Sequence, residues 1–402
     1  MSIIRDITLK AQKYLETDDI IIFIGARQAG KTTILKQIQA ILEQKKQTVN
    51  FLNLEDLSYL ELLNQSPKNI FKIFALDLNK KNYIFIDEIQ YLKNPSNFLK
   101  YLHDQYQDKI KLIASGSSAF YLDKKFKDSL AGRKKIFNVR TLSFKEFLRF
   151  KQENDLAGKD FSNLSLVEKE KTAFYFYEYM LYGGYPRVVL SALSEKQELL
   201  REIAFSYIKK DIFEANIKQD EIFYKLFKIL ASQTSGLVNF SELASTLGVS
   251  KTAIDNYLYV MQKSFHIWLL KPFFKNIRKE LTKMPKIFFN DLGLRNFFLN
   301  NFSSFEQRDD KGALLENAVF RQLIERYECE DIRFWRTIQK KEVDFIINEK
   351  EAFEVKVNAQ KIKKADYKIF SKNYPDIVLS IISIDKKTDK VSLYKIYDVW
   401  EK

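Results

Sequence analysis

The sequence is poor in the residues that form disulfides and zinc sites. It contains one cysteine, Cys329, and two histidines, His103 and His266, among its 402 residues. A single cysteine cannot form a disulfide within the chain, and three scattered side chains cannot make a Cys/His zinc site. No apolar run approaches the ~18 residues of a membrane-spanning helix. The first residues also lack an apolar core of signal-peptide length, so we expect a cytoplasmic protein with no membrane partner.

Basic residues outnumber acidic ones, 66 to 52, which gives a formal net charge of +14. Such an excess suggests nucleic-acid binding. Lysine, asparagine, isoleucine, phenylalanine and tyrosine are abundant together, however, as in proteins of AT-rich genomes, so the position of the charge matters more than its sum. Within residues 271–286, Glu280 stands against six basic residues, which are Lys271, Lys275, Arg278, Lys279, Lys283 and Lys286. This basic stretch favours contact with DNA, duplex or branched.

Residues 25–32 read G-A-R-Q-A-G-K-T, a complete phosphate-loop pattern. An apolar β-branched run, residues 20–24, precedes it, and apolar residues follow at helical spacing, as the strand–loop–helix context requires. Backbone N–H groups of such a loop bind phosphates at a helix N-terminus. We therefore predict ATP contacts from Gly25, Ala26, Arg27, Gln28, Ala29, Gly30, Lys31, Thr32 and Thr33. Lys31 would reach the β- and γ-phosphates, and the Thr32 hydroxyl would ligate Mg²⁺.

Two further apolar strands end in polar residues. Residues 83–88 read Y-I-F-I-D-E, and in P-loop enzymes the first acid, here Asp87, holds Mg²⁺. Glu88 would polarise the attacking water. Residues 110–114 form another strand, and Ser115 follows it as a candidate sensor of the γ-phosphate. A strand ending in a polar turn explains either pattern without function.

The chain divides by pattern into four segments. Residues 1–145 alternate strands and helices, which predicts a doubly wound α/β domain. Residues 146–230 are rich in helix formers and predict a helical lid. Residues 231–300 predict a winged helix, with a glycine turn at Gly248, a helix capped by Ser250, and a hairpin. Its second helix would expose Lys251, Thr252, Asp255 and Asn256, and it serves either as a DNA reader or as a spacer between domains.

Residues 301–402 carry a second set of charged side chains. Glu316 lies within a predicted helix, and Asp344 heads a strand of a hairpin. In the strand 353–357, Glu354 and Lys356 share one face by the two-residue period of a strand. Two carboxylates and a lysine on one face can hold Mg²⁺ and activate water for phosphodiester attack. An ordinary hairpin with a charged solvent face fits the alternation equally well.

These motifs in this order resemble prokaryotic AAA+ ATPases of the archaeal-ATPase type, with a C-terminal domain related to PD-(D/E)XK nucleases. The resemblance rests on the phosphate loop, I-D-E-I-Q at 86–90, S-G-S-S at 115–118, S-L-A-G-R at 129–133, Y-G-G-Y-P at 182–186, P-K-I-F-F-N-D-L-G-L at 285–294 and the E…E-V-D…E-V-K set. It implies an AAA+ core with a helical lid, a winged helix and an α/β restriction-endonuclease-like domain.

The resemblance also implies roles for individual residues. Arg133 corresponds to an arginine finger that acts on a neighbouring subunit, which implies self-association into a ring, and Arg140 is the competing finger. Tyr185 and Pro186 correspond to a turn laid against the adenine, and Arg187 to a lid sensor. Glu316, Asp344, Glu354 and Lys356 match the nuclease superfamily's helix acid, metal ligands and lysine. For both arginine-finger candidates, a structural salt bridge is the alternative role.

Two functions fit the sequence. The first is a Mg²⁺-dependent ATPase that binds DNA and cuts or remodels it. The second is a nucleotide switch of the signal-transduction type, whose C-terminal parts dock a protein partner without nuclease activity.

Overall fold

The computed structural model describes residues 3–117, 130–273, 284–358, 364–384 and 393–395. Contacts group the chain into two compact units. The first comprises Met1–Thr141, Tyr207–Ile217 and Lys263–Phe265, and the second comprises Leu142–Ser206, Lys218–Gln262 and His266–Lys402. The boundary near residue 141 lies close to the predicted end of the ATPase core. The division of the remaining chain into three domains stays a prediction.

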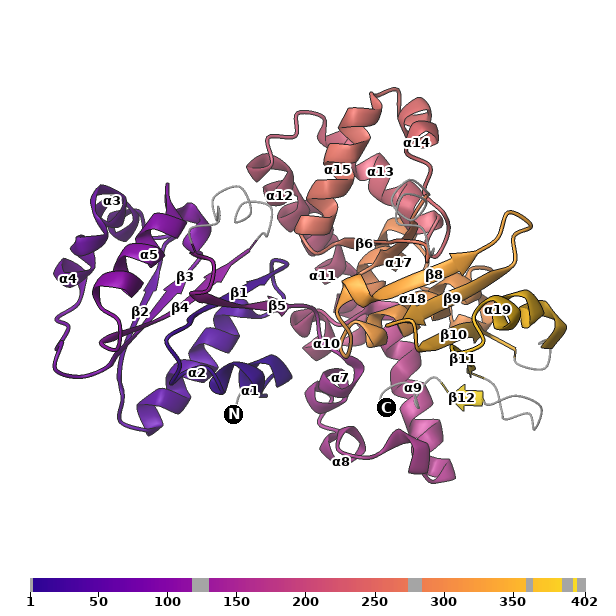
Figure 1. Ribbon diagram of the computed structural model, residues 1–402, viewed down its shortest axis with the longest axis horizontal. Coiled ribbons are helices and arrows are strands. Elements are labelled where there is room, and N and C mark those ends of the chain that lie inside the picture. The colour runs from indigo at the N-terminus through magenta and orange to yellow at the C-terminus, as the bar shows by residue number, and fades with distance from the viewer. Residues whose placement is uncertain (1–2, 118–129, 274–283, 359–363, 385–392, 396–402) are drawn as a thin grey trace. The chain divides into compact units, whose positions relative to one another are not determined.

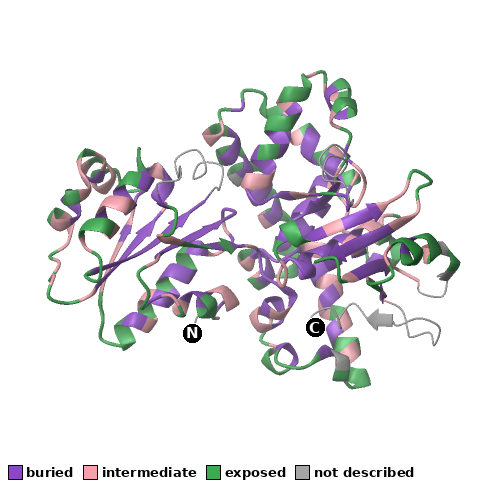
Figure 2. Cartoon of the chain, viewed as in Figure 1, coloured by how far each residue is buried: buried purple, intermediate pink, exposed green. Residues whose placement is uncertain are grey.

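A five-stranded parallel sheet forms the centre of the first unit (Figure 1). Its strands are β1 (Ile20–Gly25), β2 (Thr48–Asn53), β3 (Asn82–Asp87), β4 (Ile110–Gly116) and β5 (Lys134–Val139), in the order β2-β3-β4-β1-β5. The sheet confirms the predicted α/β class. Every residue of β1, β3 and β4 is buried, as Figure 2 shows, because parallel sheets are covered on both faces.

Helices cover both faces of this sheet. They are α1 (Asp6–Gln12), α2 (Lys31–Gln44), α3 (Leu57–Gln65), α4 (Ile70–Ile73) and α5 (Pro95–Gln105), with α1 and α2 on one face and α3 to α5 on the other (Figure 1). A later helix, α12 (Ile208–Glu214), also belongs to this unit. Because β4 lies between β1 and β3, the residues that follow these three strands meet at one edge of the sheet.

The second unit begins with helices. They are α7 (Phe144–Phe150), α8 (Asn154–Ala157), α9 (Leu166–Tyr182), α10 (Pro186–Leu190) and α11 (Lys196–Glu202). A π-helical turn, Ile203–Tyr207, follows α11. Then come α13 (Asp220–Ser232), α14 (Phe240–Leu247), α15 (Lys251–Lys263), the antiparallel strands β6 (Ile267–Leu270) and β7 (Lys286–Phe289), and α17 (Leu292–Leu299).

The predicted glycine turn and helix cap between α14 and α15 are confirmed. Gly248 ends α14 in the left-handed region with φ 67°, where glycine has no Cβ penalty. The Ser250 hydroxyl accepts a hydrogen bond from the Ala253 N–H at 3.1 Å. Four cations of the basic stretch, Lys275, Arg278, Lys279 and Lys283, lie outside the described residues.

Two of the motifs pack against each other. Asp291 accepts hydrogen bonds from the Gly184 N–H at 2.8 Å and the Leu294 N–H at 3.0 Å. A Cβ on Gly293 would lie 2.1 Å from the Tyr182 carbonyl oxygen, so only glycine allows this approach of α17 to α9. The glycines of Y-G-G-Y-P and of N-D-L-G-L are thus explained by packing within the second unit.

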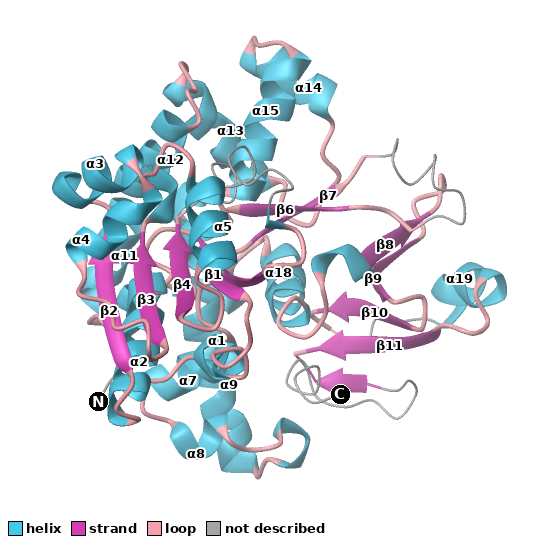
Figure 3. Ribbon diagram, turned by 60° about the vertical axis from the view of Figure 1, so that its left-hand side comes forward, coloured by secondary structure: helices cyan, strands magenta, loops and turns pink. Residues whose placement is uncertain are grey.

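A second five-stranded sheet ends the chain (Figure 3). It follows α18 (Lys311–Leu323) and contains β8 (Ile332–Arg336), β9 (Glu342–Ile347), β10 (Glu351–Lys356), β11 (Val378–Ser383) and β12 (Leu393–Lys395). The strands β8, β9 and β10 are antiparallel, and α19 (Lys368–Asn373) leads to β11, which pairs parallel to β10. Among the helices of the described residues, none is long and apolar enough to cross a membrane.

Candidate functional site

The phosphate loop joins β1 to α2 through two glycines that are sterically required. A Cβ on Gly25 would lie 2.1 Å from the Val139 carbonyl oxygen, because β5 pairs with β1 up to this residue. Gly30 caps α2 with φ 99°, a conformation that favours glycine. The structure therefore supplies the strand, tight loop and helix N-terminus that bind phosphate.

Lys31 lies inside this loop. Its side chain is 5% exposed, and its Nζ donates to the carbonyl oxygens of Gly25 at 3.0 Å and Ala26 at 2.9 Å. Burial lowers the pKa of Lys31, although the charges of Glu88 and Asp87 act in the opposite direction. The lysine is thus placed in the concave side of the loop, where an anion would gain most from its charge.

Asp87 brings together the ends of three strands. Its Oδ2 accepts a hydrogen bond from Thr32 Oγ1 at 2.6 Å, and its Oδ1 accepts one from Ser115 Oγ. The carboxyl group is 1% exposed. Thr32 lies 55 positions before Asp87, and Ser115 lies 28 positions after it. Three residues that were predicted for one site therefore converge. A hydroxyl beside a carboxylate is an oxygen pair of the kind that Mg²⁺ prefers.

Glu88 follows directly and has an unusual backbone. Its φ is 58°, in the left-handed region that residues other than glycine adopt with strain. Gln90 Nε2 donates to Glu88 Oε2 and, at 2.8 Å, to Ser117 Oγ, while the Ser117 N–H donates to Gln90 Oε1 at 3.3 Å. Gln90 therefore ties Glu88 to the residue that follows β4. The sequence placed Gln90 in a motif but gave it no role.

Arg27 has partners that the sequence did not indicate. Its guanidinium pairs with Glu214 and lies 3.5 Å from Asp211, and both acids are on α12. The three side chains are 8%, 15% and 3% exposed respectively. The helix that carries the acids lies 187 positions along the chain, and no local pattern connects it with the loop.

The two arginine-finger candidates, Arg133 and Arg140, flank opposite ends of strand β5. The Arg133 carbonyl accepts a hydrogen bond from the Ile20 N–H, where β1 begins, and its side chain pairs with Asp104 at 2.8 Å. β1 runs for six residues, or about 20 Å, before the phosphate loop, so Arg133 cannot reach the loop of its own subunit. Arg140 follows the last residue of β5, at the end of the strands where the phosphate loop lies. Arg133 could therefore act only on a neighbouring subunit.

The residues predicted to contact the adenine belong to the second unit. Tyr185 is buried and precedes Pro186, which begins α10. Arg187 is exposed and makes two hydrogen bonds to Glu202, at 3.1 and 2.9 Å. Their contact with nucleotide stays a prediction.

The C-terminal acids are brought together as predicted. Phe353 pairs with Phe345 across β9 and β10, so the next pair along this register is Glu354 with Asp344, on one face. Asp344 Oδ2 accepts a hydrogen bond from the Val355 N–H at 2.9 Å, and Lys356 pairs with Glu354. Glu354 is 4% exposed, so the alternative of a charged solvent face is wrong. The acids face α18 and β7 instead.

Lys286 completes this cluster and was misassigned from the sequence. It was predicted as part of a DNA-facing basic stretch, but its side chain is 1% exposed. Its Nζ lies 2.8 Å from Glu316, 2.5 Å from Glu342 and 3.2 Å from Asp344. Burial alone would lower the pKa of Lys286, but the charges of these carboxylates raise it, so the ammonium stays charged. The sequence alone does not show whether a lysine at the start of an apolar strand points into the core or toward solvent.

Two acids of the cluster, Glu316 and Glu354, have raised pKa values. Burial and the charge of Asp344 raise the pKa of Glu316 to about 8 and that of Glu354 to about 7. Within the described ranges, no group of three or more His, Cys, Asp or Glu side chains is arranged to hold a metal ion. The role of Glu316, Asp344 and Glu354 as metal ligands stays a prediction.

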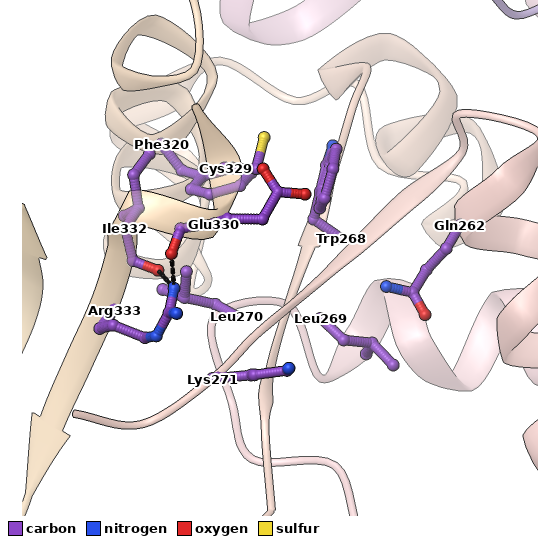
Figure 4. A pocket seen from close by; sticks show the side chains of 10 residues that line it. All are labelled: Gln262, Trp268, Leu269, Leu270, Lys271, Phe320, Cys329, Glu330, Ile332 and Arg333. Atoms are coloured by element: carbon purple, nitrogen blue, oxygen red, sulfur yellow. Dashed lines mark hydrogen bonds between the residues drawn. The ribbon is translucent and has the colours of Figure 1, made fainter. Parts of the chain in front are cut away.

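A small hollow of about 180 Å³ lies between β6, α18 and β8 (Figure 4). Two of the polar side chains that line it bond to the protein itself. Arg333 turns back onto the carbonyl oxygens of Glu330 and Ile332, and Trp268 Nε1 donates to Asn290 at 2.8 Å. Lys271, on its rim, is exposed. We interpret the hollow as a packing gap and not as a ligand site.

Replacing Lys286 with methionine tests the acid cluster. Lys286→Met should destabilise β9 and β10 by about 3–5 kcal/mol, because it leaves buried carboxylates without their cation. The loss should shrink as the pH falls, since Glu316, whose pKa is already raised and rises further without the Lys286 charge, then takes up a proton. Hydrogen exchange of the β9 and β10 amides in the full chain measures the effect. Lys350→Met, in the exposed turn between these strands, is the control, and equal exchange in both variants would contradict the cluster's role.

Comparison with known families agrees with the geometry of the first unit. Residues 17–148 match the model of a family described as an AAA domain. Residues 173–304 and 311–397 match two families described as domains of unknown function, DUF8612 and DUF4143. The first match begins just before β1 and ends after β5, so it covers all five strands of the sheet that carries the phosphate loop.

Curated proteins of two organisms are similar over most of this chain. An uncharacterised protein of Methanocaldococcus jannaschii is 29% identical over 94% of this chain and 83% of its own length. An uncharacterised protein of Haemophilus influenzae is 28% identical over 83% of this chain and 80% of its own. Among solved structures, the ORC2 protein of Aeropyrum pernix aligns with 74% of this chain and 91% of its own, at 12% identity and a TM-score of 0.42. The family match and the loop geometry together support an AAA+ P-loop domain in the first unit.

Proposed function

We propose that this protein is a Mg²⁺-dependent ATPase that acts on DNA. The observation that carries the proposal is the convergence of Thr32, Asp87 and Ser115 beside a phosphate loop whose lysine is buried within it. Glu88 stands next to this group and is held by Gln90. A loop for phosphates, an oxygen pair for a cation and a positioned carboxylate are the parts that phosphoryl transfer to water needs.

Each residue has a task in this reaction. The loop N–H groups and Lys31 bind the β- and γ-phosphates and stabilise the charge that develops on them. Glu88 orients the attacking water and accepts its proton, and Gln90 keeps the Glu88 carboxylate in place. Ser115 fixes Asp87 and lies where it can sense the terminal phosphate. Thr32 and Asp87 would hold Mg²⁺, whose charge offsets that of the phosphates when it is bound.

Hydrolysis in this scheme needs a neighbouring subunit. Arg133 lies at the start of the strands, and the phosphate loop lies at their other end. The Arg133 guanidinium can therefore stabilise a γ-phosphate only across a subunit interface. We therefore propose self-association, most simply as a ring. The exposed ion pair between Arg133 and Asp104 is weak enough to be replaced by a contact between Arg133 and the phosphate of a neighbouring subunit.

The DNA-directed part rests on the helices of the second unit. α13, α14 and α15 are followed by the antiparallel pair β6 and β7, which is the order of a winged helix. Lys251, Thr252, Asp255 and Asn256 are exposed on α15, as a recognition helix requires.

A second candidate activity is DNA cleavage by the C-terminal domain. It is supported by the order of α18, three antiparallel strands, α19 and the parallel strand β11, and by the pairing of Glu354 with Lys356 beside Asp344. Lys286 competes with any metal ion for Glu316 and Asp344. If Glu316 and Asp344 stay paired with Lys286 and bind no metal ion, the alternative is the switch hypothesis, in which this domain docks a protein partner.

Substitution of Glu88 tests the ATPase proposal. Glu88→Gln should bind ATP with near-normal affinity and hydrolyse it about 10²–10⁴-fold more slowly, because the amide cannot accept the proton of water. Phosphate release and nucleotide binding are measured in parallel. Glu43→Gln, an exposed change on α2, should hydrolyse ATP normally. A Glu88→Gln protein as active as this control would refute the assignment.

DNA binding is tested with a labelled duplex at several salt concentrations. Lys251→Glu should weaken binding and reduce the slope of log affinity against log salt by about one contact's worth, or ~0.9. Lys10→Glu makes the same charge change on exposed α1 and should have little effect. Equal losses in both variants would show that the overall charge, and not α15, attracts DNA.

The same duplex incubated with Mg²⁺ or Mn²⁺ reports cleavage. Cleavage that Lys356→Ala abolishes, with ATP hydrolysis unchanged, would establish the nuclease. Intact DNA under these conditions would favour a binding domain.

A further inference from the structure

The phosphate loop carries a second cation besides Lys31. Arg27 follows Gly25 by two residues, and its guanidinium is almost fully buried. It pairs with Glu214 through Nη2 and approaches Asp211 through Nε at 3.5 Å. A guanidinium next to a phosphate site would ordinarily contact phosphate, because its planar fork matches phosphate oxygens. Here two carboxylates hold it.

The two acids are three residues apart on α12 and therefore lie on one face of that helix. Asp211 is buried, and one oxygen of Glu214 has no hydrogen-bond partner among the described residues. Burial raises the pKa of Glu214, which Arg27 opposes. Buried ion pairs therefore link α12 to the loop, and such charges are stable only while they are paired.

These acids also belong to the electrostatic surroundings of the catalytic residues. The charge of Asp211 acts on Lys31, and that of Glu88 acts on both Arg27 and Glu214. Arg27, Asp211 and Glu214 therefore lie within electrostatic range of Lys31 and Glu88, the residues that we propose act on the terminal phosphate. A bound triphosphate would repel Asp211 and Glu214 and attract Arg27.

We propose that Arg27 is a ligand of the terminal phosphate, and that Asp211 and Glu214 compete with ATP for it. Binding of ATP would then transfer Arg27 from the acids to the phosphate and release α12 from the loop. Asp211 and Glu214 are thus competitors of ATP within the chain. Residues 207–217 would be attached to the loop without ATP and released from it when ATP is bound. This inference deepens the proposed ATPase and rests on its nucleotide site.

Linkage fixes what must follow. If ATP weakens the attachment of α12, then weakening that attachment must strengthen ATP binding by the same factor. ADP lacks the terminal phosphate, so its affinity should respond much less. The alternative is that Arg27 only anchors α12, in which case neither nucleotide is affected.

The test uses the full chain with Asp211→Asn and Glu214→Gln combined, in a Glu88→Gln background that prevents turnover. These neutral changes keep the shape of both side chains. ATP affinity, measured by isothermal titration, should rise about tenfold while ADP affinity changes little. Asp220→Asn with Glu221→Gln is the matched control, because both acids are exposed at the start of α13 and the charge change is the same.

Hydrogen exchange of the 208–217 amides supplies a second readout. In the Glu88→Gln protein, ATP should speed their exchange and ADP should not, whereas Arg27→Met should give fast exchange with or without nucleotide. Unchanged ATP affinity in the neutralised variant would overturn the proposal. Loss of ADP binding would also overturn it, since the acids would then be needed for the shape of the loop. A parent protein that binds neither nucleotide would instead refute the proposed ATPase.

Discussion

One carboxylate, that of Asp87, organises the nucleotide site. It accepts hydrogen bonds from Thr32, in the first turn of α2, and from Ser115, near the end of β4, so it joins the carboxyl ends of three parallel strands. The order β2-β3-β4-β1-β5 makes this possible, because it places the end of β4 between the phosphate loop and the acid turn. The start of α2, the position of Glu88 and the concave loop around Lys31 all depend on this junction.

Buried charge also occurs away from Asp87. Lys286 is enclosed by three carboxylates within the second unit. Arg27 pairs with Asp211 and Glu214 within the first unit, and this buried pairing adjoins the phosphate loop. Pairing satisfies the charges in both clusters. Under the proposed function, a nucleotide at the loop would compete with the two acids for Arg27, so we expect this pairing to respond to nucleotide.

The sequence predicted the strand, loop and helix around the phosphate loop because this pattern is local, and the binding of ATP there stays a prediction. A β-branched strand, a glycine loop and a helix specify the phosphate loop, and parallel strands bring their carboxyl ends to one edge, so Asp87 and Ser115 had to approach Thr32. The contacts of Gln90 and Arg27 escaped prediction because they join residues through side chains rather than through a pattern. Lys286 was misread since charge in a sequence carries no direction. Its neighbours in the basic stretch lie outside the described residues, so their role stays a prediction.

We propose that Thr32 and Asp87 form the cation site of a nucleotide-binding loop. Isothermal titration of ATP with and without Mg²⁺, using the wild-type chain and Asp87→Asn, tests this assignment most directly. Mg²⁺ should tighten ATP binding to the wild type and to the control Asp18→Asn, which changes an exposed acid of the same unit. In Asp87→Asn, Mg²⁺ should have little effect. Equal tightening by Mg²⁺ in the Asp87→Asn protein would show that Asp87 does not hold the cation.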